Sequence, residues 1–181
     1  MAVLIEANSV VIRLETIAEK YPGGVDQYIK DCPDGTLCKD DSIVRVGFMS
    51  PFDTGAFIED LKRLGFKYIE DEEFVEIAVV LQFIGLLRPC NWLEIVSVKI
   101  FKGNMKLSMC QIKGGALEYV DLPHGWSYEN SLSKSNRFFT SETMDKRMIF
   151  LDHTDGVDAY LDVLTGEQHF ITRTSRRKAN A

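Results

Sequence analysis

The C-terminal stretch from Arg147 to Arg173, RMIFLDHTDGVDAYLDVLTGEQHFITR, decides the fold. It contains two residue pairs, Asp155-Gly156 and Thr165-Gly166, of the kind that favours two-residue hairpin turns. These pairs separate three runs that contain β-branched and aromatic residues. We therefore predict a three-strand antiparallel meander over residues 147–154, 157–164 and 167–173.

Two-residue turns would also fix the register of this meander, placing His153 opposite Asp158 and Asp162 opposite His169 on the solvent face. The opposite face would then carry the apolar side chains of Met148, Phe150, Leu161, Val163 and Phe170. A carboxylate beside an imidazole favours its charged form. Two interpretations stay open: an acid/base pair or pH sensor, or an ordinary cross-strand charge pair, which is the commoner arrangement.

A second hairpin is predicted over residues 92–101 and 105–113, because Gly103-Asn104 is a turn signal between two apolar runs. If these two residues form the loop, Ile100 lies opposite Leu107. One face of the hairpin then carries Val96, Val98, Ile100, Leu107 and Met109, and we expect this face to belong to the core.

Helices are predicted only in the N-terminal half. Apolar residues recur at helical spacing over residues 14–21 and 25–32, on either side of a Pro-Gly-Gly turn. A third helix begins after Ser50, a capping residue followed by proline, and ends at Gly65. Strands predicted at 43–48 and 74–82 flank this helix, which indicates a βαβ-like or split β-α-β unit.

The pattern is that of an α+β protein: mostly antiparallel sheet, three short-to-medium helices in the N-terminal half and a C-terminal three-strand meander. We expect a single α+β domain over residues 1–172, with a possible sub-boundary near 83–91, and a basic flexible tail at 173–181. Residues 83–87 have no polar side chain, so they predict either a buried crossover, which is the commoner case, or a homo-oligomer contact.

The chain is acidic. It has 181 residues, with 21 Lys and Arg against 27 Asp and Glu. Four of the basic residues, Arg173, Arg176, Arg177 and Lys178, lie in the tail. Without them 17 basic residues face 27 acidic ones, a net charge of −10. Such a body repels phosphate, which argues against binding nucleic acid.

The four cysteines, Cys32, Cys38, Cys90 and Cys110, form no CxxC pair, and no secretory leader is evident at the N-terminus. The longest apolar stretch, residues 74–87, is too short to span a bilayer. We therefore expect a cytoplasmic protein with reduced thiols and no membrane partner.

Local signatures of common enzymes are missing from the sequence: it has no phosphate-binding glycine loop, no nucleophile elbow and no zinc-ligand spacing. The acidic run that begins at Asp152 lacks the spacing of a calcium loop. We accordingly assign no metal and no cofactor.

The long polar connection over residues 123–147 contains the best candidate contact surface, formed by His124, Trp126 and Tyr128. Exposed aromatic side chains favour recognition, although the same residues could instead anchor the loop on the sheet. Cys90, beside Trp92, is a second candidate. A nucleophilic cysteine needs a nearby base, and no histidine is close to Cys90 in the sequence.

Two functions remain. The first is a non-enzymatic protein-binding module, of the inhibitor, immunity or regulatory type, that uses an acidic surface and the aromatic loop. The alternative is a small-molecule-binding protein or an enzyme with a His/carboxylate or Cys90-based site. The candidate binding residues are His124, Trp126, Tyr128, Cys90, Trp92, Asp162 and His169.

Overall fold

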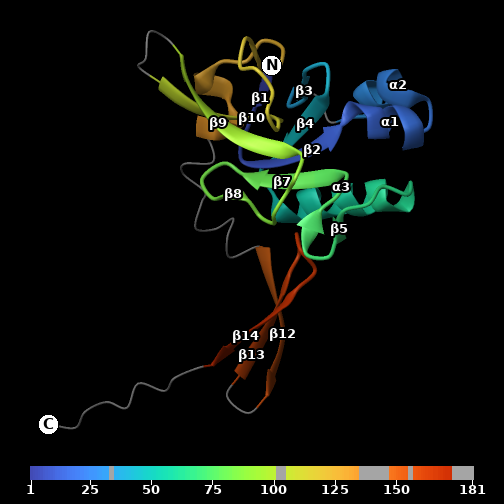
Figure 1. Cartoon of the computed structure of the whole chain (residues 1–181). Helices are drawn as coiled ribbons and strands as arrows, with labels where there is room; N and C mark the ends of the chain where they lie inside the picture. Colours follow the sequence, from blue (N-terminus) through green and yellow to red (C-terminus); the bar gives the residue numbers. More distant parts are fainter. Residues whose placement is uncertain (33–34, 101–104, 135–146, 155–156, 173–181) are drawn as a thin grey trace, which may run out of the picture.

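A five-stranded antiparallel sheet forms the centre of the chain's N-terminal half (Figure 1). The computed structural model describes residues 1–32, 35–100, 105–134, 147–154 and 157–172. In order across this sheet the strands are β3 (Cys38–Lys39), β4 (Ile43–Phe48), β2 (Asn8–Arg13), β7 (Ile77–Leu81) and β8 (Gly85–Leu86).

The predicted split β-α-β unit is confirmed. Both β4 and β7 run antiparallel to β2, which lies between them, so β4 and β7 are parallel to each other. They are joined through α3 (Pro51–Arg63), which begins where expected: the Ser50 hydroxyl accepts a hydrogen bond from the Asp53 amide at 3.4 Å. Gly65 follows the helix with a φ of +88°, a left-handed conformation that favours glycine.

The two other predicted helices form a hairpin beside the sheet. They are α1 (Leu14–Lys20) and α2 (Gly24–Asp31), separated by the turn at Pro22-Gly23. Neither is long enough to be stable alone, and the Tyr21 and Tyr28 rings hold them together edge to face at 5.1 Å. The fold is therefore α+β, as the sequence predicts.

A second sheet has the strand order β11-β1-β10-β9, with β11 (Val120–Asp121), β1 (Ala2–Leu4), β10 (Met105–Ile112) and β9 (Leu93–Ile100). The predicted hairpin is confirmed as β9–β10, but its register differs by two residues, because Ile100 pairs with Met105 and Val98 with Leu107. A shift of two residues keeps every side chain on its face, so Leu107 and Met109 are still buried. A small hairpin of β5 (Ile69–Glu70) and β6 (Glu73–Phe74) completes the N-terminal half.

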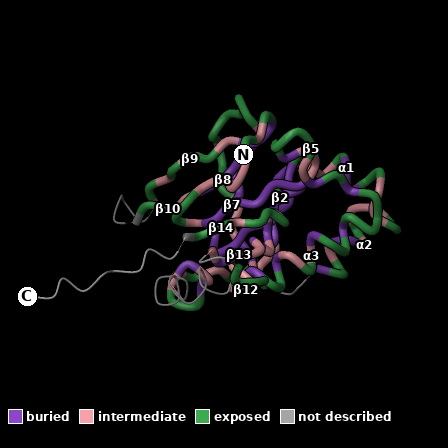
Figure 2. Tube along the Cα trace, turned by 90° about the horizontal axis from the view of Figure 1, so that it is seen from below, coloured by how far each residue is buried: buried purple, intermediate pink, exposed green. Residues whose placement is uncertain are grey.

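The core lies around β2, β4 and β7, where Figure 2 shows the buried residues. In β4 the five residues from Ile43 to Gly47 are all buried, on both faces of the strand. One face contacts α3, and on the other the Arg45 side chain bonds to Leu4 of β1. Packing on both faces explains why this strand has a continuous apolar sequence interrupted by one charge.

The C-terminal meander is confirmed as a third sheet, ordered β12-β13-β14, which extends away from the other two (Figure 1). Its strands are β12 (Met148–Thr154), β13 (Val157–Asp162) and β14 (Gln168–Thr172). The pairing of His153 with Asp158 is as predicted. The pairing of Asp162 with His169 is wrong, because His169 lies opposite Tyr160.

This second register is shifted because the turn is longer than the two residues expected. The β13–β14 pairing closes at Asp162 and Glu167, whose amide and carbonyl are bonded at 2.9 Å. Leu164, inside the turn, is buried in the core of the N-terminal half. The burial of Leu164 therefore determines the length of this turn, and it overrides the local preference of Thr165-Gly166 for a two-residue turn.

The assignment of faces in the meander also needs correction. Phe150 and Met148 lie on the histidine face, because a bulge in β12 at Leu151 reverses the alternation. Asp158 and Asp162 are buried rather than solvent-facing, whereas Phe170 is exposed. Asp158 and Asp162 are thus buried and several large apolar side chains are exposed, which is the opposite of what the sequence predicts.

The apolar stretch 83–87 is not a buried crossover. Phe83 and Ile84, in the turn between β7 and β8, are exposed. The turns expected at Pro33-Asp34, Gly103-Asn104 and Asp155-Gly156, residues 135–146 of the polar connection and the 173–181 tail lie outside the described residues. In the part of the chain that the structure describes, no helix is long and apolar enough to cross a membrane.

Candidate functional site

The C-terminal sheet carries an unusual number of exposed apolar side chains. The exposed fractions are 52% for Phe150, 44% for Leu151, 67% for Phe170 and 54% for Ile171. By pairing, Phe150 and Ile171 lie on one face and Phe170 on the other. Large exposed apolar side chains gathered on one small element are typical of interaction surfaces, so this sheet is the candidate site.

Polar contacts fix the base of this sheet to the N-terminal half. The Tyr68 hydroxyl donates a 2.6 Å hydrogen bond to the Leu164 carbonyl, and Arg88 forms an ion pair with Glu167. Within the sheet, Arg147 donates from Nε to Asp162 at 2.9 Å and makes a second bond through its terminal nitrogen. These contacts hold the base of the sheet against the N-terminal half.

The charges at the base depend on these partners. Burial raises the pKa of the Asp162 carboxyl, but hydrogen bonds from Arg147 and the Leu164 amide, with the Arg147 charge, more than offset it, so the pKa lies below its ordinary value. The hydrogen bond from Arg88 lowers the pKa of Glu167. Both carboxyl groups are thus held ionised, as structural anions rather than proton donors.

The structure separates the predicted His/carboxylate sites. His153 Nδ1 lies 2.5 Å from Asp158, as the predicted register requires. His169 lies apart from Asp162, with its Nε2 3.9 Å from Glu167, and Asp162 is bonded to Arg147 instead. His153 and Asp158 thus form the cross-strand pair that the predicted register requires.

The aromatic loop is tied to the core by a buried acid. Glu6, at the bend between β1 and β2, accepts hydrogen bonds from Trp126 Nε1 at 3.0 Å and from the Ser133 hydroxyl at 2.9 Å. Its other oxygen lies 3.5 Å from the fully buried Arg45. Trp126 is half-buried with its polar atom directed inward, which is an anchoring contact.

The other two residues of the predicted contact surface lie near Trp126 in the sequence. His124 is exposed, and Tyr128 is half-buried at the start of the 3₁₀ turn Tyr128–Asn130. Only the outer part of this loop is therefore available to a partner.

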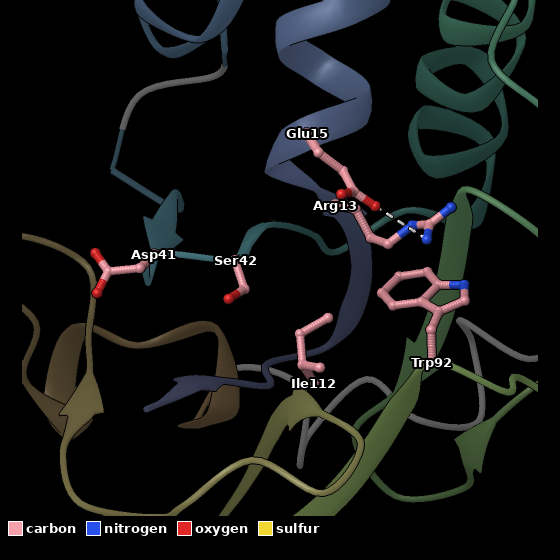
Figure 3. Close-up of a pocket in the computed structure, with 6 residues that line it drawn as sticks. All are labelled: Arg13, Glu15, Asp41, Ser42, Trp92 and Ile112. Carbon is pink, nitrogen blue, oxygen red and sulfur yellow. Dashed lines mark ion pairs between the residues drawn. The ribbon is translucent and has the colours of Figure 1, made fainter.

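Trp92 borders a different feature, a hollow of about 360 Å³ (Figure 3). The hollow is lined by Arg13, Glu15, Asp41, Ser42, Trp92 and Ile112. The Arg13 guanidinium lies over the Trp92 ring at 5.6 Å and pairs with Glu15 at 3.1 Å. Asp41 and Ser42 lie on the opposite side of it (Figure 3).

Cys90 itself is half-buried. Burial raises the pKa of its thiol, although the amides of Trp92 and Leu93 and the Arg13 charge act in the opposite direction. A raised pKa disfavours the thiolate that nucleophilic chemistry requires. Cys90 therefore has the properties of a packed thiol.

Comparison with known proteins gives no relative. No protein-family model, no curated protein and no solved structure matches this chain. Among the described residues, no group of three or more His, Cys, Asp and Glu could hold a metal ion. Function must therefore be argued from the surface itself.

Most of the exposed apolar set is not predicted by the alternation pattern of the sequence. Alternation in the meander assigned Phe150 and Phe170 to a covered face, and Leu151 and Ile171 were not singled out. One signal was present: Phe150-Leu151 and Phe170-Ile171 are adjacent apolar pairs, so strict alternation must expose one member of each pair unless both faces are covered.

Proposed function

We propose that this chain is a protein-binding module whose recognition element is the C-terminal sheet. The observation that supports it is the exposure of four large apolar side chains, Phe150, Leu151, Phe170 and Ile171, on one small sheet. Three-stranded sheets need a covered hydrophobic face to be stable, and a partner protein provides such a cover. Phenylalanine, like the other aromatic residues, is also enriched at the centre of protein interfaces.

The partner is a protein of opposite charge. The body of the chain has a net charge of −10, and β12 adds the exposed carboxylate of Asp152 to the apolar surface. Opposite fields speed the encounter of two proteins and disfavour wrong partners. An inhibitor, immunity or regulatory protein directed at a basic target has these properties.

Site-specific photocrosslinking tests this function. A photoreactive amino acid at position 170 should capture one protein from an extract of the source cells, saturably and in competition with the untagged native chain. The same group at position 119, an exposed tyrosine whose carbonyl is bonded to β1 of the second sheet, is the control. The captured protein, once purified, should bind the native chain but not the Phe150→Ser/Ile171→Ser double variant.

Equal capture at positions 170 and 119, or undiminished binding of the captured protein to the double variant, would remove the C-terminal sheet from recognition. Because both substituted side chains are mostly exposed, the variant should keep the fold, and its circular dichroism checks this.

A second candidate is binding of a small molecule in the hollow beside Trp92, which the stacked Arg13 guanidinium and the facing Asp41 favour. A ligand there should change Trp92 fluorescence, and the change should disappear in Arg13→Gln. A fluorescence response to a panel of amino acids and nucleotides that persists in Arg13→Gln would place the ligand elsewhere.

A further inference from the structure

We propose that a hollow on the C-terminal sheet receives an arginine side chain from the basic protein partner. This rests on the proposed function and specifies its chemistry. The hollow has a volume of about 250 Å³ and is lined by Asp152, Thr154, Val157, Ala159 and Phe170. It combines an apolar floor, one aromatic wall and one carboxylate wall.

The hollow arises from the register of the three strands. Asp152 in β12 pairs with Ala159 in β13, which in turn pairs with Phe170 in β14, so the three side chains form one row on the same face. The small central alanine leaves a gap between two larger neighbours. Adjacent strands are about 4.8 Å apart, so Asp152 and Phe170 face each other across about 10 Å.

The carboxylate wall is already oriented. Asp152 accepts a 2.7 Å hydrogen bond from the His153 amide on one oxygen and a 3.0 Å bond from the Thr154 hydroxyl on the other. Each oxygen retains a free lone pair for a further donor. An incoming cation therefore meets a carboxylate whose position is fixed before binding, which reduces the entropic cost of association.

The aromatic wall favours arginine over lysine. Phe170 is the most exposed residue of the sheet's apolar set, so its ring is accessible to a planar group. A guanidinium can stack at about 4 Å from a ring and still donate to a carboxylate at about 3 Å, and a gap of about 10 Å accommodates both contacts. The compact lysine ammonium makes point contacts and does not stack in this way.

The acidic surroundings exclude the other charge types. Anions are repelled by the net charge of −6 and by Asp152, and a neutral apolar side chain would leave the Asp152 carboxylate beside it without a counter-charge. The apolar floor formed by Val157 and Ala159 suits the three methylenes of an arginine.

Fluorescence anisotropy with two labelled peptides of equal charge, hexa-arginine and hexa-lysine, tests the proposal. General attraction to the acidic chain affects both peptides equally, so the ratio of their affinities is the informative quantity. We expect the native chain to bind hexa-arginine about three- to five-fold more tightly than hexa-lysine. Phe170→Leu, which keeps apolar bulk without a ring, should bring this ratio to about one, and Asp152→Asn should lower it.

Asp26→Asn is the matched control, since it removes one exposed negative charge on α2 and should leave the ratio unchanged. A ratio near one for the native chain, or a ratio unaffected by Phe170→Leu, overturns the arginine proposal. If crosslinking at position 170 still captures a partner in that case, the proposed function stands and only the arginine inference fails.

The chain's own tail is the competing occupant. In a variant with Arg173, Arg176 and Arg177 all changed to Gln, an arginine-to-lysine ratio equal to that of the native chain supports a partner's arginine. A ratio that rises several-fold in this variant shows that the native hollow is filled by the tail, and overturns the proposal.

Discussion

Glu6 joins three parts of the chain that are distant in sequence. Its carboxylate bonds to Trp126 and Ser133 in the aromatic loop and lies beside Arg45 in β4. Both charges are almost completely buried, so each depends on the other for compensation. A Cβ at Gly47 would lie 2.8 Å from Arg45 Nη1, so this position needs glycine for the arginine to fit.

We predict that Glu6→Gln destabilises the fold strongly. The substitution keeps the shape of the side chain but leaves the Arg45 charge buried without a counter-ion, which typically costs about 3–5 kcal/mol. Urea unfolding measures the free energy, with Glu15→Gln as control, since Glu15 is mostly exposed in its pair with Arg13 and should contribute less than about 1 kcal/mol. Equal destabilisation in both variants would show that Arg45 does not depend on Glu6.

The lowered pKa of Asp162 predicts a specific dependence of stability on pH. Because the pKa is lower in the folded state than in the unfolded chain, Asp162 contributes stability that is complete well above its ordinary value of 3.8 and is lost as the pH falls through the folded value. The native chain should therefore lose more stability between about pH 5 and pH 3 than Asp162→Asn does. Parallel decreases in the two chains, measured by urea unfolding at each pH, would contradict this.

Among the elements, those defined by strong local signals were predictable. Ser50-Pro51 begins α3 and Gly65 ends it, and β-branched runs gave β2, β4 and the three strands of the meander. Two predicted registers, those of β9–β10 and β13–β14, differ from the observed ones by two residues, because each was derived from an assumed turn position. In the meander, burial of Leu164 draws Val163 and Leu164 into the turn, a tertiary effect that no local pattern contains.

The candidate site was less predictable than the elements. The sequence indicates that Trp126 either contacts a partner or anchors its loop on the sheet. The anchoring bond is made to Glu6, 120 residues away, so no local pattern could have identified it. The hollow between Asp152 and Phe170 lies on the face opposite His153, as the predicted register requires, but that face is exposed rather than covered. The bulge in β12 carries no clear sequence signal, so alternation alone placed Met148 and Phe150 on the wrong face.

The attachment of the C-terminal sheet depends on Tyr68. We predict that Tyr68→Phe costs about 1–2 kcal/mol, because it removes the hydrogen bond to the buried Leu164 carbonyl. In this variant, hydrogen exchange should accelerate more for the amides of β13 and β14 than for those of β2, since Tyr68 holds the base of the C-terminal sheet. Tyr119→Phe, on an exposed tyrosine, is the control; uniform acceleration across both sheets would show that Tyr68 supports the core generally.

At the scale of the whole molecule, charge and shape act together. The C-terminal sheet, with its exposed apolar groups, projects from an acidic body (Figure 1), and the four basic residues among the last nine of the sequence partly offset the negative charge. Long-range attraction depends on net charge and is screened by salt, whereas the apolar contacts are not. Encounter rate and residence time should thus respond to different parts of this protein.

We predict that changing Arg173, Arg176, Arg177 and Lys178 to Gln, which takes the net charge from −6 to −10, speeds association with a basic peptide. Stopped-flow measurements with labelled hexa-arginine should show a faster association rate for this variant at low salt. Both rates should fall by about ten-fold or more as salt is raised, and they should converge at about 0.5 M, where screening removes the difference. Slower association of the variant at low salt would contradict this prediction. It would mean that the basic tail contacts the basic peptide despite their like charges, and that net charge does not govern the encounter.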